Sequence, residues 1–300
     1  MSETWRRFAR MGATITLGCG LSGCTLRVLD PAGPVGMQER TILLNAFVVM
    51  LFIIIPTMAA TLAFVWWYRP GNPRAVRRPH WSFSGRVEIV TWSIPLMTVM
   101  FLGGIAWIGS HDLDPGKPLT SPEKPLEVQV VSLDWKWLFL YPEARVASLN
   151  RLVIPVGRPV RFRLTSASVW NGFFVPRLGS MIYTMNGMAT RLNLQADREG
   201  SFLGLSSHLS GDGFADMTFE TRAVPEAAFA AWIGGAQGST DTLDDDAYRA
   251  LSRQSSKVPP KTFRLADDGL FDRIVAQALP PGPGPVSGRP DPTVSPRQGN

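Results

Sequence analysis

The chain has 300 residues, 45% of them hydrophobic, and a formal net charge of +6 at pH 7. This composition is too apolar for a disordered protein, and the length leaves room for one modest core beside other segments. The basic excess lies near the start and at 69–87, while residues 110–300 carry no net charge. The charge therefore points to membrane topology and excludes a nucleic-acid-binding face.

A secretion signal is predicted at residues 1–23. Arginines near the start precede a ten-residue apolar stretch at 11–20, which is too short for a bilayer, since a span takes about 20 residues. The sequence Leu-Ser-Gly-Cys ends at Cys24 and resembles a bacterial lipoprotein box. That resemblance implies that Cys24 receives a diacylglyceryl group and becomes the first residue of the mature chain. The alternative is an ordinary buried cysteine in a first membrane helix.

Two apolar runs, 42–68 and 89–110, contain no charged residue and predict an antiparallel pair of membrane-spanning helices, because each exceeds about 18 residues. The connecting loop, 69–88, holds five arginines, whereas the outer flank 24–41 holds two. The excess of arginine near helix ends places this loop in the cytoplasm. We therefore expect a bacterial inner-membrane protein whose N-terminus and long C-terminal half face the periplasm.

Residues 111–225 predict a small all-β sandwich with one face of each sheet on the core. The chain here has short β-branched and aromatic runs between turn residues, and in one of them Val160, Phe162 and Leu164 alternate with polar residues. The expected strands are 126–141, 152–155, 159–166, 172–176, 190–196 and 217–224. The segment 226–279 predicts short helices at 226–233, 242–252 and 268–279, and the Pro/Gly-rich tail at 280–300 predicts disorder.

Two sequence blocks carry a family resemblance. Ser132 begins the run Ser-Leu-Asp-Trp-Lys-Trp-Leu-Phe-Leu-Tyr-Pro, and Asn171 begins Asn-Gly-Phe-Phe-Val-Pro-Arg-Leu-Gly-Ser. With the lipoprotein box and the two spans, these blocks resemble subunit II of haem-copper terminal oxidases, and among them the cytochrome bo type of ubiquinol oxidase. The resemblance covers about residues 24–233 and implies a cupredoxin-like fold for the outer domain.

Members of this superfamily that accept electrons from cytochrome c hold a binuclear copper centre in this domain. Two thiolates bridge its copper ions, and two imidazoles and a thioether complete the donor set, since soft sulfur ligands suit copper. The resemblance places the ligand positions on Asn171, Ser206, Ser210, Phe214 and Met217, and the intervening position that bears a carboxylate on His208. Four of the five side-chain ligands are missing, so we expect no metal and no catalytic residue in this chain.

Two further residues are candidates for a role in the complex. Trp135 matches the tryptophan through which electrons enter the copper centre, and its alternative role is an aromatic packed at the junction with subunit I. Glu88 lies at the start of the second span, where the resemblance implies the entrance of a proton-uptake pathway in subunit I. Its alternative explanation is a carboxylate favoured by the helix dipole at an N-terminus.

The sequence therefore predicts a lipid-anchored, non-catalytic subunit II of a proton-pumping ubiquinol oxidase that reduces dioxygen. The resemblance implies that subunit I holds the haems and copper, that subunits III and IV and membrane lipids are the other partners, and that cytochrome c is not one. Two alternatives remain open. One is a membrane-anchored cupredoxin-like lipoprotein that acts as a scaffold or assembly factor, and the other is a cytochrome c oxidase subunit.

Overall fold

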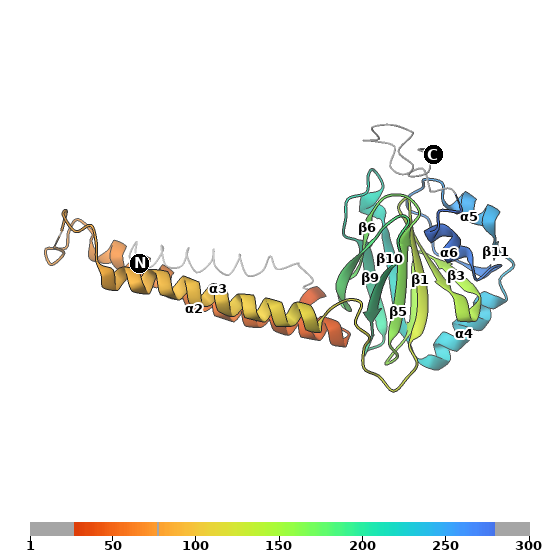
Figure 1. The fold of residues 1–300 in the computed structure, drawn as a ribbon, viewed down its shortest axis with the longest axis horizontal. Coiled ribbons are helices and arrows are strands. Elements are labelled where there is room, and N and C mark those ends of the chain that lie inside the picture. Colours follow the sequence, from red (N-terminus) through yellow and green to blue (C-terminus); the bar gives the residue numbers. More distant parts are fainter. Residues whose placement is uncertain (1–26, 77, 280–300) are drawn as a thin grey trace, which may run out of the picture.

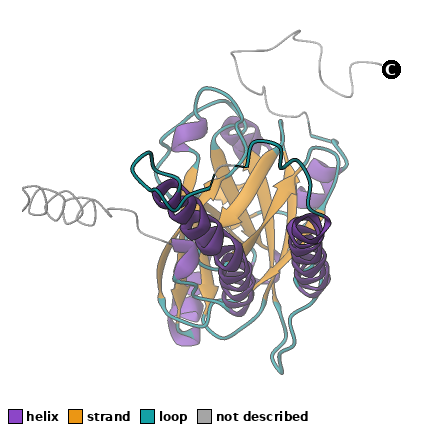
Figure 2. Cartoon of the chain, turned by 90° about the vertical axis from the view of Figure 1, so that its left-hand side faces the viewer, coloured by secondary structure: helices purple, strands orange, loops and turns teal. Residues whose placement is uncertain are grey.

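Two long helices project from one side of a two-layered β domain in the computed structural model, which describes residues 27–76 and 78–279 (Figure 1). The predicted signal at 1–23, the lipidation residue Cys24 and the tail at 280–300 lie outside these residues. Figure 2 looks along the two helices toward the sheets and shows them side by side in front of the strands. The fold is thus a membrane hairpin followed by a β-sandwich.

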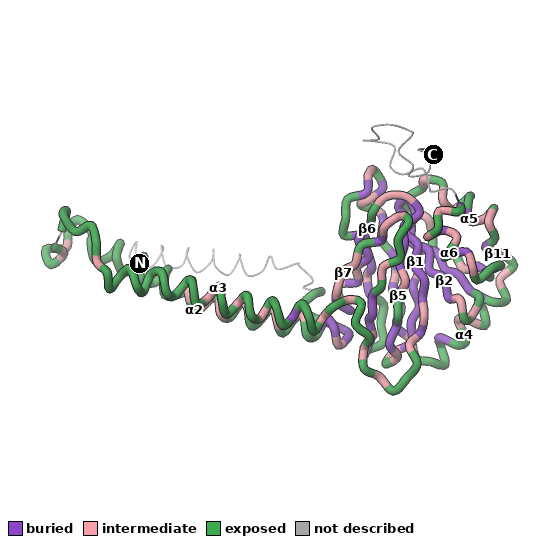
Figure 3. Tube along the Cα trace, in the orientation of Figure 1, coloured by how far each residue is buried: buried purple, intermediate pink, exposed green. Residues whose placement is uncertain are grey.

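The hairpin consists of α2 (Pro34–Trp67) and α3 (Gly85–Asp112), preceded by the short 3-10 turn η1 (Arg27–Leu29). Both helices are long and apolar enough to cross a membrane, and they are exposed along most of their length (Figure 3). At about 1.5 Å per residue, the 34 residues of α2 reach about 50 Å, well beyond a bilayer core of about 30 Å. The excess places part of α2 outside the hydrocarbon core.

The extra length of α2 lies at its N-terminal end. The helix begins at Pro34, eight residues before residue 42, where the first span was predicted to begin. Pro34 occupies the first turn, where its fixed φ suits a helix and its missing N–H is not needed. Residues 34–41 include Gln38, Glu39 and Arg40, so hydropathy alone does not detect this part of the helix. Of these side chains, Glu39 contacts the β domain.

A turn in the second sequence block, Arg177 to Ser180, contacts the start of α2. The Gly36 amide donates to the Leu178 carbonyl at 3.0 Å, and Glu39 accepts hydrogen bonds from the Ser180 amide and hydroxyl, both at 2.8 Å. Gly179 has φ +103°, and a Cβ there would come within 2.7 Å of the Gly36 nitrogen. Glycine is therefore required where the helix approaches this turn.

The first layer is a seven-stranded sheet in the order β11-β12-β3-β2-β1-β5-β8. The strands β1 and β5 run parallel, and Val128 pairs with Phe162, both fully buried. The bounds are β11 (Thr242–Leu243), β12 (Lys261–Leu265), β3 (Val146–Leu149), β2 (Lys136–Tyr141), β1 (Leu126–Leu133), β5 (Val160–Ser166) and β8 (Thr190–Leu194).

The second layer is a five-stranded sheet in the order β4-β10-β9-β6-β7. In this sheet β10 runs parallel to β4 and antiparallel to β9. The bounds are β4 (Arg151–Pro155), β10 (Thr218–Val224), β9 (Gly200–Ser206), β6 (Asn171–Val175) and β7 (Gly179–Thr184). The short 3-10 turns η2 (Pro142–Ala144) and η3 (Phe214–Asp216) connect strands.

An aromatic cluster fills the space between the sheets. Trp137 and Phe139 from the first layer meet Phe173 and Phe219 from the second, with ring centroids 5.1–6.5 Å apart. These distances allow tilted and edge-to-face contacts, which aromatic pairs prefer. A Cβ at Gly204 would lie 2.1 Å from the Phe219 ring. The ring therefore packs directly on the Gly204 backbone, in addition to its contacts with the other rings.

The C-terminal segment forms a second core on the other face of the seven-stranded sheet. Three helices follow the sandwich: α4 (Glu226–Gln237), α5 (Asp245–Leu251) and α6 (Leu270–Val275). Tyr248, Phe271 and Ile274 pack with Leu138 and Leu140 of β2 in one buried cluster. All residues of β2 are buried, because helices cover one face and the aromatic cluster covers the other.

Several expectations about this domain were wrong. The run 126–141 is two strands with a turn at Trp135, and the predicted all-helical segment 226–279 contains β11 and β12, which extend the first sheet. The helix expected at 242–252 begins only at Asp245, because Asp244 is the N-cap whose carboxylate accepts from the Ala247 amide. Both faces of the first sheet are therefore buried at β1 and β2, whereas the sequence predicted that only one face would be buried.

Replacement of Phe173 by alanine removes the ring that joins Trp137 to Phe219. We expect the free energy of unfolding to fall by about 3–5 kcal/mol, as measured by denaturant unfolding of the detergent-solubilised chain with tryptophan fluorescence. Phe174→Ala is the matched control, because Phe174 is only partly buried. An equal loss in both variants would contradict the assignment of the core.

Candidate functional site

Four of the six positions matched to the copper site gather at one end of the second sheet. Asn171 begins β6, Ser206 ends β9, and Met217 precedes β10, while Ser210 lies in the loop between β9 and β10. All four are buried, with exposed fractions of 1% for Asn171 and Met217, 4% for Ser206 and 6% for Ser210. The structure thus brings together residues separated by up to 46 positions in the sequence.

Hydrogen bonds join these four side chains. The Ser206 hydroxyl donates to the Asn171 amide oxygen at 3.1 Å, and the Ser210 hydroxyl donates to the Met217 sulfur at 3.8 Å. The Ser206 amide also donates to the Met217 carbonyl at 3.0 Å. The groups that face one another are two hydroxyls, one amide and one thioether, and all of them are neutral.

The side chains of the two remaining positions lie outside this cluster, although the His208 carbonyl lies 3.2 Å from the Ser206 hydroxyl as a hydrogen-bond acceptor. His208 is exposed, and its ring lies edge-on to Tyr183 with centroids 5.7 Å apart. Phe214 lies in η3, and its carbonyl accepts from the Met217 amide at 3.0 Å. Among the described residues, 27–76 and 78–279, no group of three His, Cys, Asp or Glu side chains could hold a metal ion.

Trp135 closes the cluster from the first sheet. It adopts φ +62° in the turn between β1 and β2, and its indole N–H donates to the Ser210 carbonyl at 3.1 Å. A Cβ at Gly213 would lie 2.3 Å from the Trp135 ring, so the indole packs directly on the loop backbone. Its exposed fraction is 8%. The indole is therefore held in place by contacts within this domain.

Lys136, the next residue, is buried beneath the C-terminal segment. Its ammonium donates to the Arg253 carbonyl and to the Ser255 hydroxyl, both at 2.6 Å. Burial lowers the pKa of Lys136 to about 8, although the nearby Asp134 carboxylate opposes the shift. The side chain therefore ties the turn at Trp135 to residues 253–255, a contact that no sequence pattern indicated.

Glu88 lies in the first turn of α3, distant from this cluster. Its amide donates to the Ser84 carbonyl at 3.0 Å, as expected at a helix start. The residue is exposed, and among the described residues its carboxylate forms none of the ion pairs found elsewhere in the chain. Its position fits both explanations derived from the sequence.

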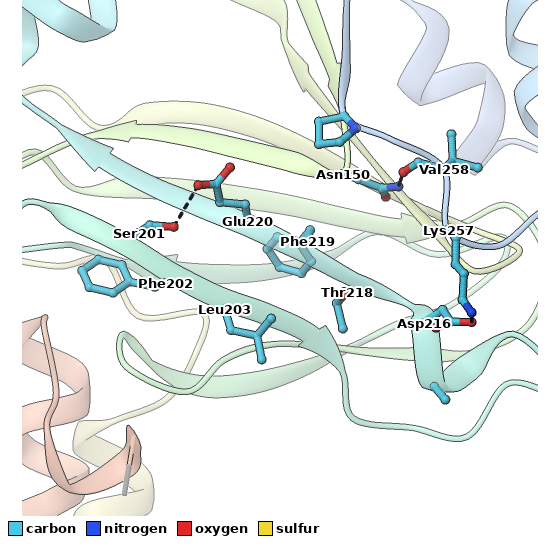
Figure 4. Close-up of a pocket in the computed structure, with 12 residues that line it drawn as sticks. Asn150, Ser201, Phe202, Leu203, Asp216, Thr218, Phe219, Glu220, Lys257 and Val258 are labelled. Atoms are coloured by element: carbon cyan, nitrogen blue, oxygen red, sulfur yellow. Dashed lines mark hydrogen bonds and ion pairs between the residues drawn. The ribbon is translucent and has the colours of Figure 1, made fainter. Parts of the chain in front are cut away.

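A groove of about 540 Å³ lies over β9 and β10, beside the cluster (Figure 4). Glu220 stands in it and accepts from the Ser201 hydroxyl at 2.9 Å, while Arg151 and Arg222 form ion pairs with the same carboxylate at 3.0 and 2.8 Å. Lys257 and Asp216 pair at 3.7 Å at its end. The carboxylates in this groove are neutralised by their neighbours, which suits a structural role.

Two family models match the chain. One, described as the periplasmic domain of cytochrome c oxidase subunit II, matches residues 127–224, and the other, described as the COX aromatic rich motif, matches residues 237–282. The periplasmic domain of subunit II of cytochrome oxidase of Bradyrhizobium japonicum aligns at 26% identity, with 39% of this chain and 96% of that chain covered and a TM-score of 0.36.

Full-length relatives are more similar. Ubiquinol oxidase subunit 2 of Acetobacter aceti is 45% identical over 273 residues, which cover 90% of this chain and 88% of that protein. The cytochrome bo(3) ubiquinol oxidase subunit 2 of Pseudomonas aeruginosa is 43% identical over 257 residues, covering 86% and 78%. The chain belongs to the ubiquinol oxidase subunit 2 family. This quinol oxidase subunit II has the membrane hairpin and the β-sandwich expected from the resemblance.

The aromatic rich motif is the part of this subunit that sequence reasoning missed. The family resemblance found from the sequence ended near residue 233, whereas the second family model matches residues 237–282. A signal was present, because Phe263 and Leu265 alternate with Thr262 and Arg264, the pattern of a half-buried strand. The polar residues around this short run concealed it.

Lys136 gives the stability of this subunit a defined pH dependence. Below about pH 8 the ammonium is charged in both the folded and the unfolded chain. From there up to the ordinary pKa of 10.5, the unfolded chain keeps a proton that the folded chain has lost, so stability rises with pH.

We expect the melting temperature of the wild type to rise relative to Lys136→Met between pH 7.5 and 10, by a few °C, since 1 kcal/mol corresponds to about 2–4 °C in a domain of this size. Thermal melts of the two proteins measure this difference. Lys124→Met is the control, because Lys124 is exposed. A constant difference between wild type and Lys136→Met would refute the assignment.

Proposed function

We propose that this chain is the subunit II of a proton-pumping ubiquinol oxidase and that it carries no copper centre of its own. The proposal is supported by the side chains that occupy the positions matched to the copper ligands. Ser206, Ser210, Asn171 and Met217 offer two hydroxyls, an amide and a thioether, and the hydroxyls are engaged in hydrogen bonds with the other two.

This donor set does not fit a binuclear copper centre. Such a centre needs two bridging thiolates, because soft sulfur donors hold the copper pair and share its charge. The whole sequence has two cysteines, Cys19 and Cys24, and both precede the membrane hairpin. The hydroxyls of Ser206 and Ser210 are hydrogen-bonded to Asn171 and Met217, and neutral hydroxyls are poor substitutes for thiolates.

The route of electrons follows from this mismatch. With no acceptor centre in the outer domain, electrons from ubiquinol pass through the haems and copper of subunit I, and no soluble cytochrome c delivers them here. The chain acts as a structural subunit in the bacterial inner membrane, in contact with subunits I, III and IV and with lipids. Its two helices anchor a rigid domain above the membrane, held by the contact between Glu39 and Ser180.

Purification of the assembled complex through a tag on this chain tests the proposal. We expect co-purified haem, oxygen consumption with ubiquinol but not with reduced cytochrome c, and no near-infrared copper absorption from the outer domain. Copper bound to this chain, or turnover supported by cytochrome c, would overturn the proposal. Recovery of the chain without a haem-bearing partner would favour a free scaffold or assembly factor instead.

We also propose that the mature chain begins at Cys24 and carries a lipid there. The sequence before it has the order of a lipoprotein signal, with basic, apolar and small residues. Mass spectrometry of the purified chain should give a mass that lacks residues 1–23 and includes acyl groups. Cys24→Ser should abolish both changes, and an unprocessed wild-type chain would contradict the proposal.

Glu88 is proposed to stand at the entrance of the proton-uptake pathway on the cytoplasmic side. An exposed carboxylate at a membrane boundary can collect protons from the water phase, and ionisable groups at such positions often serve proton transfer. We expect Glu88→Gln to lower proton-coupled turnover of the complex, with the largest loss at alkaline pH, where free protons are scarce. Glu123→Gln, which removes an exposed carboxylate from the outer linker, is the control. Unchanged turnover of Glu88→Gln across pH would remove the hypothesis.

A further inference from the structure

The loop between α2 and α3 has an unusual charge composition. Residues 69–87, which comprise this loop and the first residues of α3, contain five arginines, one histidine and no acidic residue. The described arginines of this stretch are Arg69, Arg74, Arg78 and Arg86, and all of them are exposed. Figure 1 places the loop at the end of the hairpin that is farthest from the β domain.

These arginines differ from those of the β domain in their partners. Most arginines of the β domain form ion pairs with carboxylates: Arg145, Arg151, Arg158, Arg163, Arg177, Arg198, Arg222, Arg249 and Arg273. Within residues 27–76 and 78–279, none of the four loop arginines has such a pair. The positive charge of the loop is therefore left for an anion from outside the chain.

The loop begins at an end of α2 whose aromatic side chains are typical of a membrane interface. It starts directly after Trp66, Trp67 and Tyr68, which form the aromatic end of α2. Arg69 lies over the Trp66 ring, 4.9 Å from its centroid, and the Asn72 side-chain amide donates to the Trp67 carbonyl at 2.6 Å. These contacts turn the chain back at the helix end.

Exposed apolar side chains accompany the charges. Val76, Trp81 and Phe83 are 60–69% exposed, although they belong to a short polar loop. Tryptophan and phenylalanine beside arginine suit the membrane interface, where rings enter the headgroup region and guanidinium groups meet phosphates. An acidic protein surface would satisfy the charges but offers no matching place for these three side chains.

We propose that this loop is a binding site for anionic phospholipids of the cytoplasmic leaflet. Guanidinium groups bind phosphate oxygens through paired, charge-assisted hydrogen bonds. Each basic residue near an anionic bilayer surface contributes about 1 kcal/mol. The site goes beyond the topological effect of the arginines, because it selects one class of lipid. It rests on the membrane orientation of the hairpin and not on the oxidase activity.

Native mass spectrometry of the full-length chain in detergent micelles that contain equal amounts of phosphatidylglycerol and phosphatidylcholine tests this site. We expect the wild type to retain phosphatidylglycerol in preference, and this preference to fall about thirtyfold in the double variant R74Q/R78Q, since two basic residues together contribute about 2 kcal/mol. The variant R74K/R78K should keep most of it, because the charge remains. The control R161Q/R191Q removes two exposed arginines of the β domain and should leave the preference unchanged.

Three results would overturn the site. They are an equal retention of both lipids by the wild type, an equal loss in R74Q/R78Q and R161Q/R191Q, and a preference that is unchanged in R74Q/R78Q. The third result would direct attention to an acidic protein surface as the partner of the loop. Circular dichroism of each variant confirms that the helices are intact, and because the measurement needs no turnover, its failure is distinct from failure of the proposed oxidase function.

Discussion

The orientation of the β domain above the membrane depends on one contact, the seating of the first turns of α2 on the turn from Arg177 to Ser180. Glu39 reaches both donors of Ser180, and Asp30 pairs with Arg177 and Arg198. The hydrogen bond from Arg198 lowers the pKa of Asp30 below its usual value, because it stabilises the charged carboxylate. Because α2 is continuous from this contact into the membrane, the domain follows the tilt of the hairpin.

Local patterns predicted the parts of the fold that local physics determines. Uncharged runs of more than twenty residues identify the spans, and the alternation along β5 identifies a strand. The strands β7 and β9 were missed because their outward residues are apolar or small, as with Met181 and Tyr183 in β7, and β12 was missed because polar residues surround its short alternating run. Their strand form depends on pairing with distant segments, such as β12 with β3, and sequence periodicity does not record such pairing.

The candidate site shows the same division. Spacing and resemblance identified Asn171, Ser206, Ser210 and Met217, which do gather, since β6, β9 and β10 are neighbours in one sheet. The site of Trp135 was not predictable, because it depends on a positive φ at the turn and on close approach to Gly213. The burial of Lys136 under residues 253–255 was also beyond sequence reasoning, because the two segments are more than a hundred residues apart.

If the chain carries no copper centre, as we propose, the neutral cluster supplies the contacts that hold the loop after β9 in place. A copper centre would join the loop after β9 to β6 and β10 through metal bonds, and metal binding of that kind is coupled to folding. Here the bonds from Ser206 to Asn171 and from Ser210 to Met217 make the same connections. A single neutral hydrogen bond contributes only about 1 kcal/mol, but the aromatic packing of Trp135 on Gly213 adds to it. On the proposed function, the loop therefore closes around its own polar groups in place of a metal.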